Sequence, residues 1–438
     1  MKIRITPVQR LGGSVDVPGD KSISHRAALL GALAEGRTEI SGFLEGEDCL
    51  NTLKAIRSLG VGVERKGPGH YLVDGVGLLG LSEPDNVIDC GNSGTTARLL
   101  LGVLAGQPFT SVLTGDDSLR RRPMGRVTEP LRLMGASFSG RDGARRLPMA
   151  VTGTRPLRAI AYSSPVASAQ LKTALLLAGL WADGPVSVEE PAPSRDHTER
   201  MLGGFGARLG VEGRRVTITP GAPLRGHHVT VPGDISSAAF FLVAGLVVPE
   251  GEVTVRQVGV NPTRTGLLDA LGAMGARVAG AAAARGEAGE PVADLTVRSS
   301  SLRGTAVGGG LIPRLIDEAP VLAVAACAAE GITRITDAAE LRVKESDRIA
   351  AIAAQLGRMG AAVRELPDGL EIQGAARLRG ATVSSGGDHR MALALAVAGL
   401  IADGPTVIED TECIATSFPG FLDRLNALAG ASCAVEVA

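Results

Sequence analysis

Apolar positions along the chain recur in a pattern that switches repeatedly between a helical and a strand spacing. Runs of about ten residues, mostly Ala and Leu, lead into a Gly, and alternating Thr, Val and Ile residues follow it. The first such segment is AALLGALAEGRTEI at 27–40. A long apolar run indicates a buried helix, whereas alternation indicates a half-buried strand. The segment therefore predicts a helix, a left-handed Gly cap and a strand, in that order.

This phrase occurs six times at intervals of roughly seventy residues. A second phrase, in which another helix ends at a Gly before a strand, alternates with it; its first copy is AIRSLGVGVE at 55–64. Six such units predict an α/β protein, and the similarity of 15–24 to 229–238 groups the units three and three. Segment 279–292 lacks periodicity, and we expect a mobile loop there. The Gly residues of the first phrase are Gly36, Gly106, Gly184, Gly251, Gly331 and Gly404.

Composition restricts the class of protein. The chain has 438 residues, of which 45% are apolar and 21% charged, enough for two or three domains. Its net charge of −1 disfavours a general affinity for nucleic acid or anionic membranes. No apolar run is long enough to span a membrane, the N-terminus lacks a signal-peptide pattern, and the five Cys residues form no CxxC pair. We therefore expect a soluble cytoplasmic protein with reduced thiols and no zinc site.

Unusual polar residues stand just before each of the six Ala/Leu helices. The first group, PGDKSISHR, places Lys21, Ser22 and Arg26 where a helix begins. A helix N-terminus already carries partial positive charge, so cations there require a nearby anion. Because the chain has no net positive charge, we expect these N-termini to converge on one local anion site. The other groups are DCGNSGTTAR at 89–98, SSPVASAQLK at 163–172, PGDISSA at 232–238, PRLIDE at 313–318 and SSGGDHR at 384–390.

Each group has a simpler explanation when it is taken singly. A Lys-Ser pair before a helix is normally a solvated cap, and the Arg run at 120–122 is normally an exposed loop. His25, His197 and His389 have no partner at the spacing of metal ligands. GVGLLG at 75–80 matches a dinucleotide fingerprint, but no helix pattern follows it. The repeated occurrence of Lys and Arg beside helix starts nevertheless favours anion binding.

Seven motifs resemble those of the 5-enolpyruvylshikimate-3-phosphate synthase family, and they extend over nearly the whole chain. The resemblance implies a two-domain α/β fold of six βαβαββ repeats, three per domain, around a central cleft. In that fold the first strand joins the second-half domain, so we expect domains at 18–228 and at 1–17 plus 229–438. The motifs are PGDKSISHRA, GNSGTTAR, RRRPMGR, SAQLKTALL, IDEAPVLAVAA, RVKESDR and GGDHRMA.

The resemblance also implies a reaction. The 5-hydroxyl of shikimate 3-phosphate attacks C2 of phosphoenolpyruvate, C3 takes up a proton, and loss of phosphate completes the enolpyruvyl transfer. This step belongs to chorismate and aromatic amino acid biosynthesis, and glyphosate inhibits it. Both substrates are polyanions, which would account for cations at helix N-termini. No metal or organic cofactor is implied, and we expect a monomer without nucleic-acid or membrane partners.

Site residues follow from the matching positions. Lys21 resembles the lysine that contacts both substrates and shuttles protons, Asp317 the base that deprotonates the 5-hydroxyl, and Glu345 the carboxylate that serves C3. The resemblance implies ligands of shikimate 3-phosphate at Lys21, Ser22, Arg26, Ser168, Ala169 (through its backbone), Gln170, Arg195, Asp317 and Lys344.

The implied ligands of phosphoenolpyruvate include three arginines, whose guanidinium groups pair bidentately with carboxylate and phosphate. Two features depart from many family members and resemble its second subgroup. Ala169 stands where others have a second serine, and Thr416 and Ser417 stand where others have a C-terminal lysine. The full set is Lys21, Gly94, Arg122, Gln170, Arg348 and Arg390.

Two alternatives compete with this interpretation. Enolpyruvyl transfer to UDP-N-acetylglucosamine uses the same fold, but that family normally carries a Cys in the loop that reads TGDDSLRRRPMG here. A nucleic-acid-binding protein could use the Arg run. The aromatic content of 3% and the balanced charge disfavour this second alternative.

Overall fold

Two compact units make up the chain. The computed structural model describes residues 1–280, 284–285 and 289–437. Unit 1 comprises Met1–Pro18 and the described residues from Pro232 on, except Gly289 and Glu290, which group with Gly19–Val231 in unit 2. The domains predicted from the sequence, 1–17 plus 229–438 and 18–228, have boundaries within a few residues of these.

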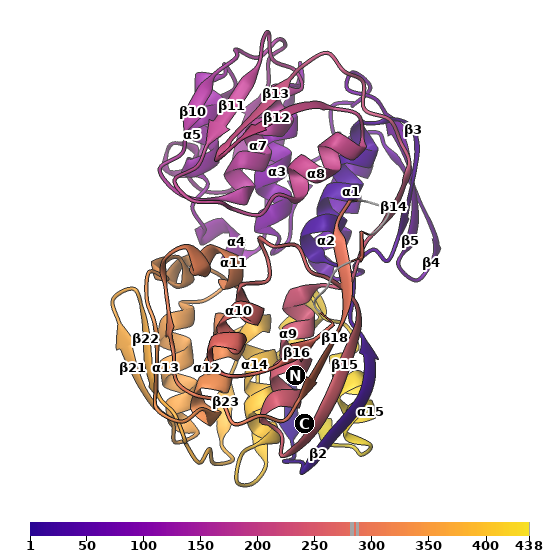
Figure 1. Cartoon of the computed structure of the whole chain (residues 1–438). Coiled ribbons are helices and arrows are strands. Elements are labelled where there is room, and N and C mark those ends of the chain that lie inside the picture. Colours follow the sequence, from indigo (N-terminus) through magenta and orange to yellow (C-terminus); the bar gives the residue numbers. More distant parts are fainter. Residues whose placement is uncertain (281–283, 286–288, 438) are drawn as a thin grey trace. The chain divides into compact units, whose positions relative to one another are not determined.

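Unit 2 repeats one sheet three times (Figure 1). Each sheet begins with a parallel pair of strands and continues with two antiparallel pairs. In sheet order the strands are β14 (His228–Thr230), β3 (Glu35–Ser41), β5 (His70–Val76) and β4 (Gly62–Gly67); β6 (Ile88–Asp89), β7 (Thr110–Thr114), β9 (Met149–Thr152) and β8 (Ser137–Gly140); and β10 (Ala161–Ser163), β11 (Val186–Glu189), β13 (Arg215–Thr219) and β12 (Arg208–Glu212).

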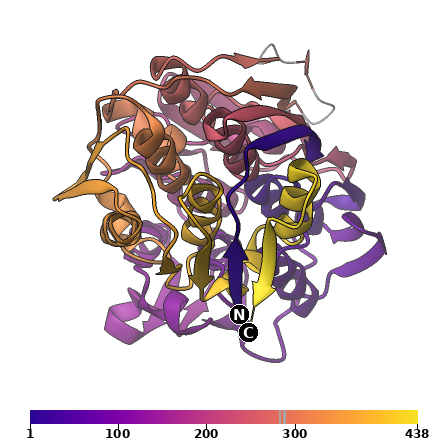
Figure 2. The ribbon, with the colours of Figure 1, turned by 90° about the horizontal axis from the view of Figure 1, so that it is seen from below.

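Unit 1 likewise contains three sheets, counted over its described residues. One of them joins the two ends of the chain, because β1 pairs with β25, and Figure 2 shows both termini side by side. In sheet order the strands are β16 (Val278–Ala279), β18 (Pro291–Arg298), β15 (Glu250–Gly259) and β2 (Arg10–Asp16); β19 (Ala306–Val307), β20 (Ile332–Ile335), β22 (Gly369–Gln373) and β21 (Ala362–Leu366); and β23 (Thr382–Ser384), β24 (Thr406–Glu409), β1 (Lys2–Ile5) and β25 (Ala434–Val437).

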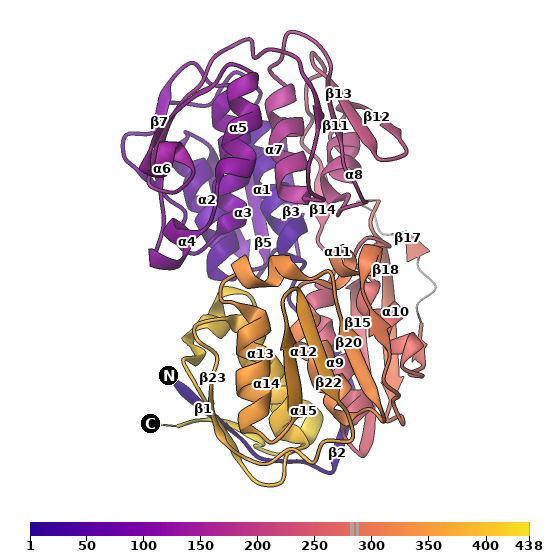
Figure 3. The same cartoon turned by 90° about the vertical axis from the view of Figure 1, so that its left-hand side faces the viewer.

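Three apolar helices form the centre of each unit, with the sheets outside them (Figure 3). Nearly every residue of these six helices is buried, which explains why they are apolar on all sides. The arrangement confirms the six-unit α/β fold predicted from the repeat. The helices are α1 (Lys21–Leu33), α3 (Gly94–Ala105) and α7 (Ala169–Gly179) in unit 2, and α9 (Ile235–Val247), α12 (Ala319–Ala328) and α14 (His389–Leu400) in unit 1.

In the described part of the chain, a second set of six helices includes the five that carry the other repeated phrase, and the left-handed Gly caps predicted for those five are confirmed. Gly60, for example, has a φ of +90° and follows the end of its helix directly. These amphipathic helices are α2 (Glu47–Ser58), α5 (Gly125–Leu133), α8 (His197–Gly204), α10 (Gly266–Ala273), α13 (Arg348–Arg358) and α15 (Phe421–Ala429). Shorter helical segments are α4 (Asp117–Arg121), α6 (Arg141–Ala144), α11 (Ile312–Leu315), η1 (Gly309–Leu311), η2 (Ala339–Val343) and η3 (Thr411–Thr416).

The predicted Gly caps of the first phrase are wrong. Helix α1 ends at Leu33, and its C-cap residue has extended backbone, so the chain passes straight into β3 without the reversal that a left-handed cap provides. The Gly residues that do have a positive φ lie beyond the helix ends. They are Gly36, Gly331 and Gly404, whereas Gly106, Gly184 and Gly251 have none.

The prediction of a mobile loop at 279–292 is wrong where the structure describes strands, since Ala279 belongs to β16 and Pro291 and Val292 belong to β18. Within this segment, Ala284–Arg285 form β17, which pairs with β18, and residues 281–283 and 286–288 lie outside the described residues. In the part of the chain that the structure describes, no helix combines the length and the apolar character needed to cross a membrane. All five Cys residues are free thiols.

Candidate active site

Capping residues begin five of the six central helices, which explains much of the polar pattern before them. Asp20, for example, accepts a hydrogen bond from the Ile23 amide at 2.9 Å at the start of α1. Such caps satisfy amides that would otherwise lack partners. Helix capping therefore accounts for the Asp and Ser residues before these helices. It does not account for the Lys and Arg residues that follow them. The remaining caps are Ser93, Ser168, Asp234 and Asp388.

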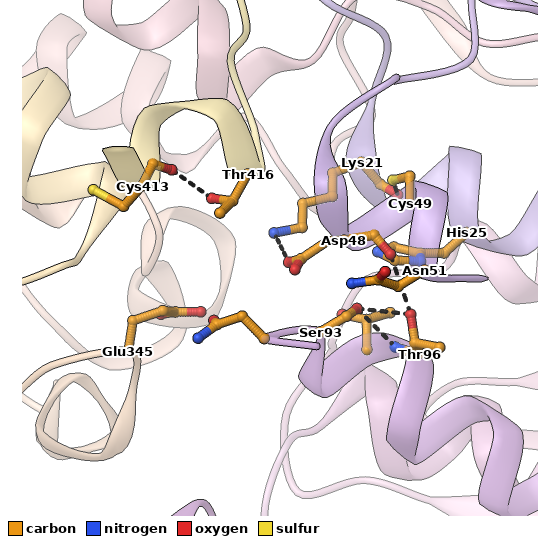
Figure 4. Close-up of polar contacts among 12 residues, drawn as sticks. Lys21, His25, Asp48, Cys49, Asn51, Ser93, Thr96, Glu345, Cys413 and Thr416 are labelled. Atoms are coloured by element: carbon orange, nitrogen blue, oxygen red, sulfur yellow. Dashed lines mark hydrogen bonds and ion pairs between the residues drawn. The ribbon is translucent and has the colours of Figure 1, made fainter. Parts of the chain in front are cut away.

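Lys21 is the first residue of α1, and its ammonium forms an ion pair with Asp48 of α2 (Figure 4). The two side chains are 16% and 8% exposed. The other carboxylate oxygen of Asp48, Oδ1, is buried without a hydrogen-bond partner among the described residues. Asp48 was not predicted from the sequence. Its contact holds Lys21 in place and leaves the ammonium partly open to a ligand.

Near Lys21, the buried side chains of His25, Thr52, Thr96 and Ser93 form a chain of hydrogen bonds. His25 Nδ1 is 2.6 Å from the Thr52 hydroxyl, which is 2.6 Å from the hydroxyl of Thr96. Thr96 in turn donates to Ser93, the cap of α3, at 2.7 Å (Figure 4). Burial, together with the charges of Lys21 and Arg26, lowers the pKa of His25 well below its ordinary value. His25 is therefore neutral at pH 7 and ties α1 to the start of α3.

Arg26, a predicted ligand of shikimate 3-phosphate, is buried among protein acceptors. Its guanidinium donates to the hydroxyls of Thr198 and Thr173 and to the backbone oxygen of Ser22. Burial lowers the pKa of Arg26 to about 10, so it is charged at neutral pH. Thus a substrate would find Arg26 already oriented.

Gly94 begins α3 beside two arginines. A Cβ added at Gly94 would lie 2.8 Å from Arg98 Nη1 and 3.4 Å from Arg122 Nη1. Arg98 Nη1 donates to Gln170 at 2.9 Å, and Arg122 donates to Asn92 Oδ1 at 2.7 Å. The predicted residues Gly94, Arg122 and Gln170 therefore lie together. Arg98 was missed, although it ends the motif GNSGTTAR.

The remaining predicted residues of unit 2 lie at helix starts. Ser22 is in the first turn of α1, and Ser168 and Ala169 are the cap and first residue of α7. Arg195 lies in the segment that leads into α8 and is close enough to Arg26 for the two charges to interact.

In unit 1, Arg348 joins the starts of three helices. This side chain is 1% exposed and is surrounded by three carboxylates. Its Nε donates to Asp388 at 2.8 Å, while its terminal nitrogens lie 2.7 Å from Glu345 and 3.4 Å from Asp317. Although burial opposes it, these carboxylates raise the pKa of Arg348. The resemblance gave roles to Asp317, Glu345 and Arg348 but none to Asp388, the buried partner of Arg348, although the motif GGDHRMA contains it.

Asp388 is fully buried, caps α14 and accepts a hydrogen bond from the Arg390 amide at 2.9 Å. Although burial opposes it, Arg348 lowers the pKa of Asp388, so the pair is ionised. The Arg390 side chain is buried, and within the described part of the chain it has no ion pair or hydrogen bond to protein. This guanidinium is therefore available to an anionic ligand.

Two predicted features lie at short helical segments of unit 1. Lys344 follows η2 and lies 3.6 Å from Glu340. Thr416 ends η3, and its hydroxyl donates to the backbone oxygen of Cys413 at 2.7 Å (Figure 4). Thr416 is therefore occupied within its own turn and contributes no charge.

Known proteins resemble the chain over its full length. The family model described as EPSP synthase (3-phosphoshikimate 1-carboxyvinyltransferase) matches residues 5–425. A 3-phosphoshikimate 1-carboxyvinyltransferase of Desulforudis audaxviator is 58% identical over 428 residues, covering 98% of this chain and 99% of that protein. One of Geobacter sulfurreducens is 57% identical over 423 residues, covering 97% and 98%. The solved structure of EPSP synthase from Acinetobacter baumannii has a TM-score of 0.88 at 43% identity and covers 100% of both chains. The match in sequence and fold, together with the cations at the helix starts, shows that the chain belongs to the EPSP synthase family.

Proposed function

We propose that this protein transfers the enolpyruvyl group of phosphoenolpyruvate to the 5-hydroxyl of shikimate 3-phosphate and releases phosphate. The observation that carries this proposal is the family match across the chain, since it covers every motif that supplies a charged residue. The contacts of those residues support it, because both units present cations beside capped helix starts, where polyanions bind well. We further propose that the protein acts as a cytoplasmic monomer.

Shikimate 3-phosphate is expected to bind mainly to unit 2. Ser168, Ala169 and Ser22 offer hydroxyls and N–H groups at the starts of α7 and α1, and Arg26 and Arg195 offer charge. Gln170, expected to contact both substrates, is held between Arg98 and Thr95, which fixes the orientation of its amide. From unit 1, Lys344 and Asp317 complete the set. Turnover then requires both units to contact the same molecule.

Phosphoenolpyruvate would use Lys21, Gly94, Arg122 and Gln170 of unit 2 and Arg348 and Arg390 of unit 1. Arg348 is held by Asp388 on one side and contacts Asp317 and Glu345 on the other. A substrate carboxylate that pairs with Arg348 competes with these last two groups. We propose that substrate binding thereby frees Asp317 and Glu345 for proton transfer.

The chemical steps then follow from these positions. Asp317 accepts the 5-hydroxyl proton as the oxygen bonds to C2, and Lys21 or Glu345 gives a proton to C3. The reverse proton transfer from C3 reforms the double bond as the C2–O bond to phosphate breaks, and the proton held by Asp317 leaves with the phosphate or passes to solvent, which restores the base. Cations around the phosphate stabilise the charge that develops on it. None of these reaction steps requires a protein group to change its oxidation state.

Phosphate release measured with shikimate 3-phosphate and phosphoenolpyruvate tests the proposal. We expect release with this pair and none when UDP-N-acetylglucosamine replaces shikimate 3-phosphate. Asp317→Asn should lower kcat by about a hundredfold or more while shikimate 3-phosphate still binds, because the amide keeps the shape but loses basicity. Activity only with UDP-N-acetylglucosamine would establish the alternative.

A further inference from the structure

A buried ionic cluster lies next to the predicted shikimate 3-phosphate ligands of unit 2. The ammonium of Lys172, on α7, is 2.8 Å from Glu190 Oε2 and 2.7 Å from Glu199 Oε1. The Lys172 and Glu190 side chains are each 4% exposed, and that of Glu199 is 9% exposed. Charged side chains are rarely buried to this extent unless they are paired. None of the three has a role in the proposed chemistry.

Glu190 holds two further groups, each beside a predicted ligand. Its Oε1 accepts the backbone N–H of Ser168 at 2.8 Å, and its Oε2 accepts the hydroxyl of Ser194 at 2.8 Å. Ser168 is itself a predicted ligand, and Ser194 directly precedes Arg195. One carboxylate thus connects two segments that are distant in sequence and predicted to bind the same substrate.

Glu199 lies on the other side of the same ammonium but lacks these connections. Among the described residues its second oxygen, Oε2, has no hydrogen-bond partner. It is therefore a comparison for Glu190, with the same charge, the same lysine and similar burial; its charge acts on Arg26, but no hydrogen bond joins it to Ser168 or Ser194.

Lys172 provides the positive charge that pairs with the buried carboxylates of Glu190 and Glu199. Although burial opposes it, Glu199 and Glu190 raise the pKa of Lys172, which keeps it protonated at neutral pH. Without that ammonium, two buried carboxylates would stand beside segments predicted to bind a phosphate group, and like charges repel.

We infer that Glu190 is a positioning residue for the shikimate 3-phosphate part of the site, and that Lys172 neutralises it there. Glu190 aligns Ser168 at the start of α7 with the segment that carries Arg195. This inference rests on the proposed function. It affects one substrate more than the other, because Arg348, predicted to bind phosphoenolpyruvate, is held through its side chain by Asp388, and Asp388 also accepts the backbone N–H of Arg390.

Glu190→Gln tests the positioning role by steady-state kinetics and by calorimetric binding of shikimate 3-phosphate. We expect its KM and Kd for shikimate 3-phosphate to rise at least about tenfold, as for a lost charge-assisted contact, with a change in the KM for phosphoenolpyruvate below about threefold. Glu199→Gln is the control and should leave both KM values within about threefold. Equal effects of the two variants, or equal shifts in both KM values, would overturn the inference.

Lys172→Met tests the neutralising role. The two carboxylates left behind take up protons as the pH falls, so their repulsion of the substrate should decrease. We expect the ratio of variant to wild-type KM for shikimate 3-phosphate to fall from pH 8 to pH 6; titration of the substrate itself cancels in this ratio. A ratio that does not change with pH contradicts the role.

A second variant and the activity of the wild type distinguish failure of this inference from misfolding and from failure of the proposed function. If Glu190→Gln fails to fold by circular dichroism, Ser194→Ala removes one connection without a charge change and should raise the same KM; an unchanged KM overturns the positioning role. A wild-type protein that releases no phosphate refutes the proposed function, whereas an active wild type with unaffected variants refutes only this inference.

Discussion

At the scale of single residues, the partner of each predicted cation decides what that cation is able to bind. Lys21 is paired with Asp48 and Arg348 with three carboxylates, while Arg390 lacks a protein anion in the described part of the chain. Gly94 is a further example of a single-residue effect, because its lack of a side chain leaves room beside Arg98 and Arg122.

Gly94→Ala should weaken the binding of glyphosate more than the binding of phosphoenolpyruvate. Its methyl group would meet Arg98 Nη1 at 2.8 Å, and Arg98 is held by Gln170 and the Pro123 backbone, so it yields little. We expect the inhibition constant of glyphosate, the longer molecule, to rise about tenfold or more, and the KM for phosphoenolpyruvate to rise by a smaller factor. Inhibition curves of wild type and variant measure both constants. Equal factors would mean that Gly94 does not discriminate between the ligands.

The burial of His25 gives stability a pH dependence. Its folded pKa is depressed, so the unfolded chain binds more protons below the ordinary histidine pKa of about 6.5. The stability that neutral His25 contributes is therefore present above about pH 6.5 and is lost as the pH falls, by at most about 1.4 kcal/mol per pH unit. His25→Gln should flatten the curve of unfolding free energy between pH 6.5 and 5 in urea titrations. The exposed His228→Gln is the control, and a curve that is equally steep in His25→Gln would contradict the assignment.

At the scale of elements, five helices end by the same device. At Gly60 the glycine N–H bonds to the Arg57 oxygen and the Val61 N–H bonds to the Ile56 oxygen, the two bonds of a Schellman motif. The same pair of bonds recurs at Gly135, Gly206, Gly275 and Gly360. Local backbone hydrogen bonds therefore explain why a Gly follows each of these five helices. They do not explain the Gly residues that follow the central helices.

Two Gly residues near the end of α13 should respond in opposite directions to Ala. Gly360 has a φ of +92°, which a side chain disfavours, so Gly360→Ala should lower the unfolding free energy by about 1 kcal/mol. Gly357 is helical and a Cβ there would meet nothing within 4 Å, so Gly357→Ala should raise it by about 0.5–1 kcal/mol. Urea unfolding of both variants measures the difference. Shifts of the same sign would contradict the cap.

At the scale of the whole molecule, the predicted ligands of shikimate 3-phosphate come from both units. The proposed function requires one polyanion to bind residues of both units, so binding should favour conformations in which the units lie closer together. We expect shikimate 3-phosphate to reduce the radius of gyration in X-ray scattering. Shikimate, which lacks the phosphate, is the matched control and should leave it unchanged. An unchanged profile at saturating shikimate 3-phosphate would show that binding does not draw the units together.

The sequence by itself determined the repeat, the helix starts and the class of ligand. Periodicity and capping act over a few neighbouring residues, so PGDKSISHR and the similar group before α14 could be interpreted without the fold. The resemblance then supplied Lys21, Asp317 and Glu345 with their expected roles.

Only the tertiary structure decided which groups hold these residues. Asp48, Arg98, Glu190 and Asp388 are single polar residues whose partners lie far away in sequence, and a lone carboxylate carries no periodic signal. Most ends of the central helices were also predicted wrongly, because such a helix ends where its strand joins a sheet and not where a Gly permits a turn; α3 does end at its predicted Gly106, but without a left-handed conformation. Local chemistry is thus visible in the sequence, whereas pairing in a buried environment depends on which elements the fold brings together.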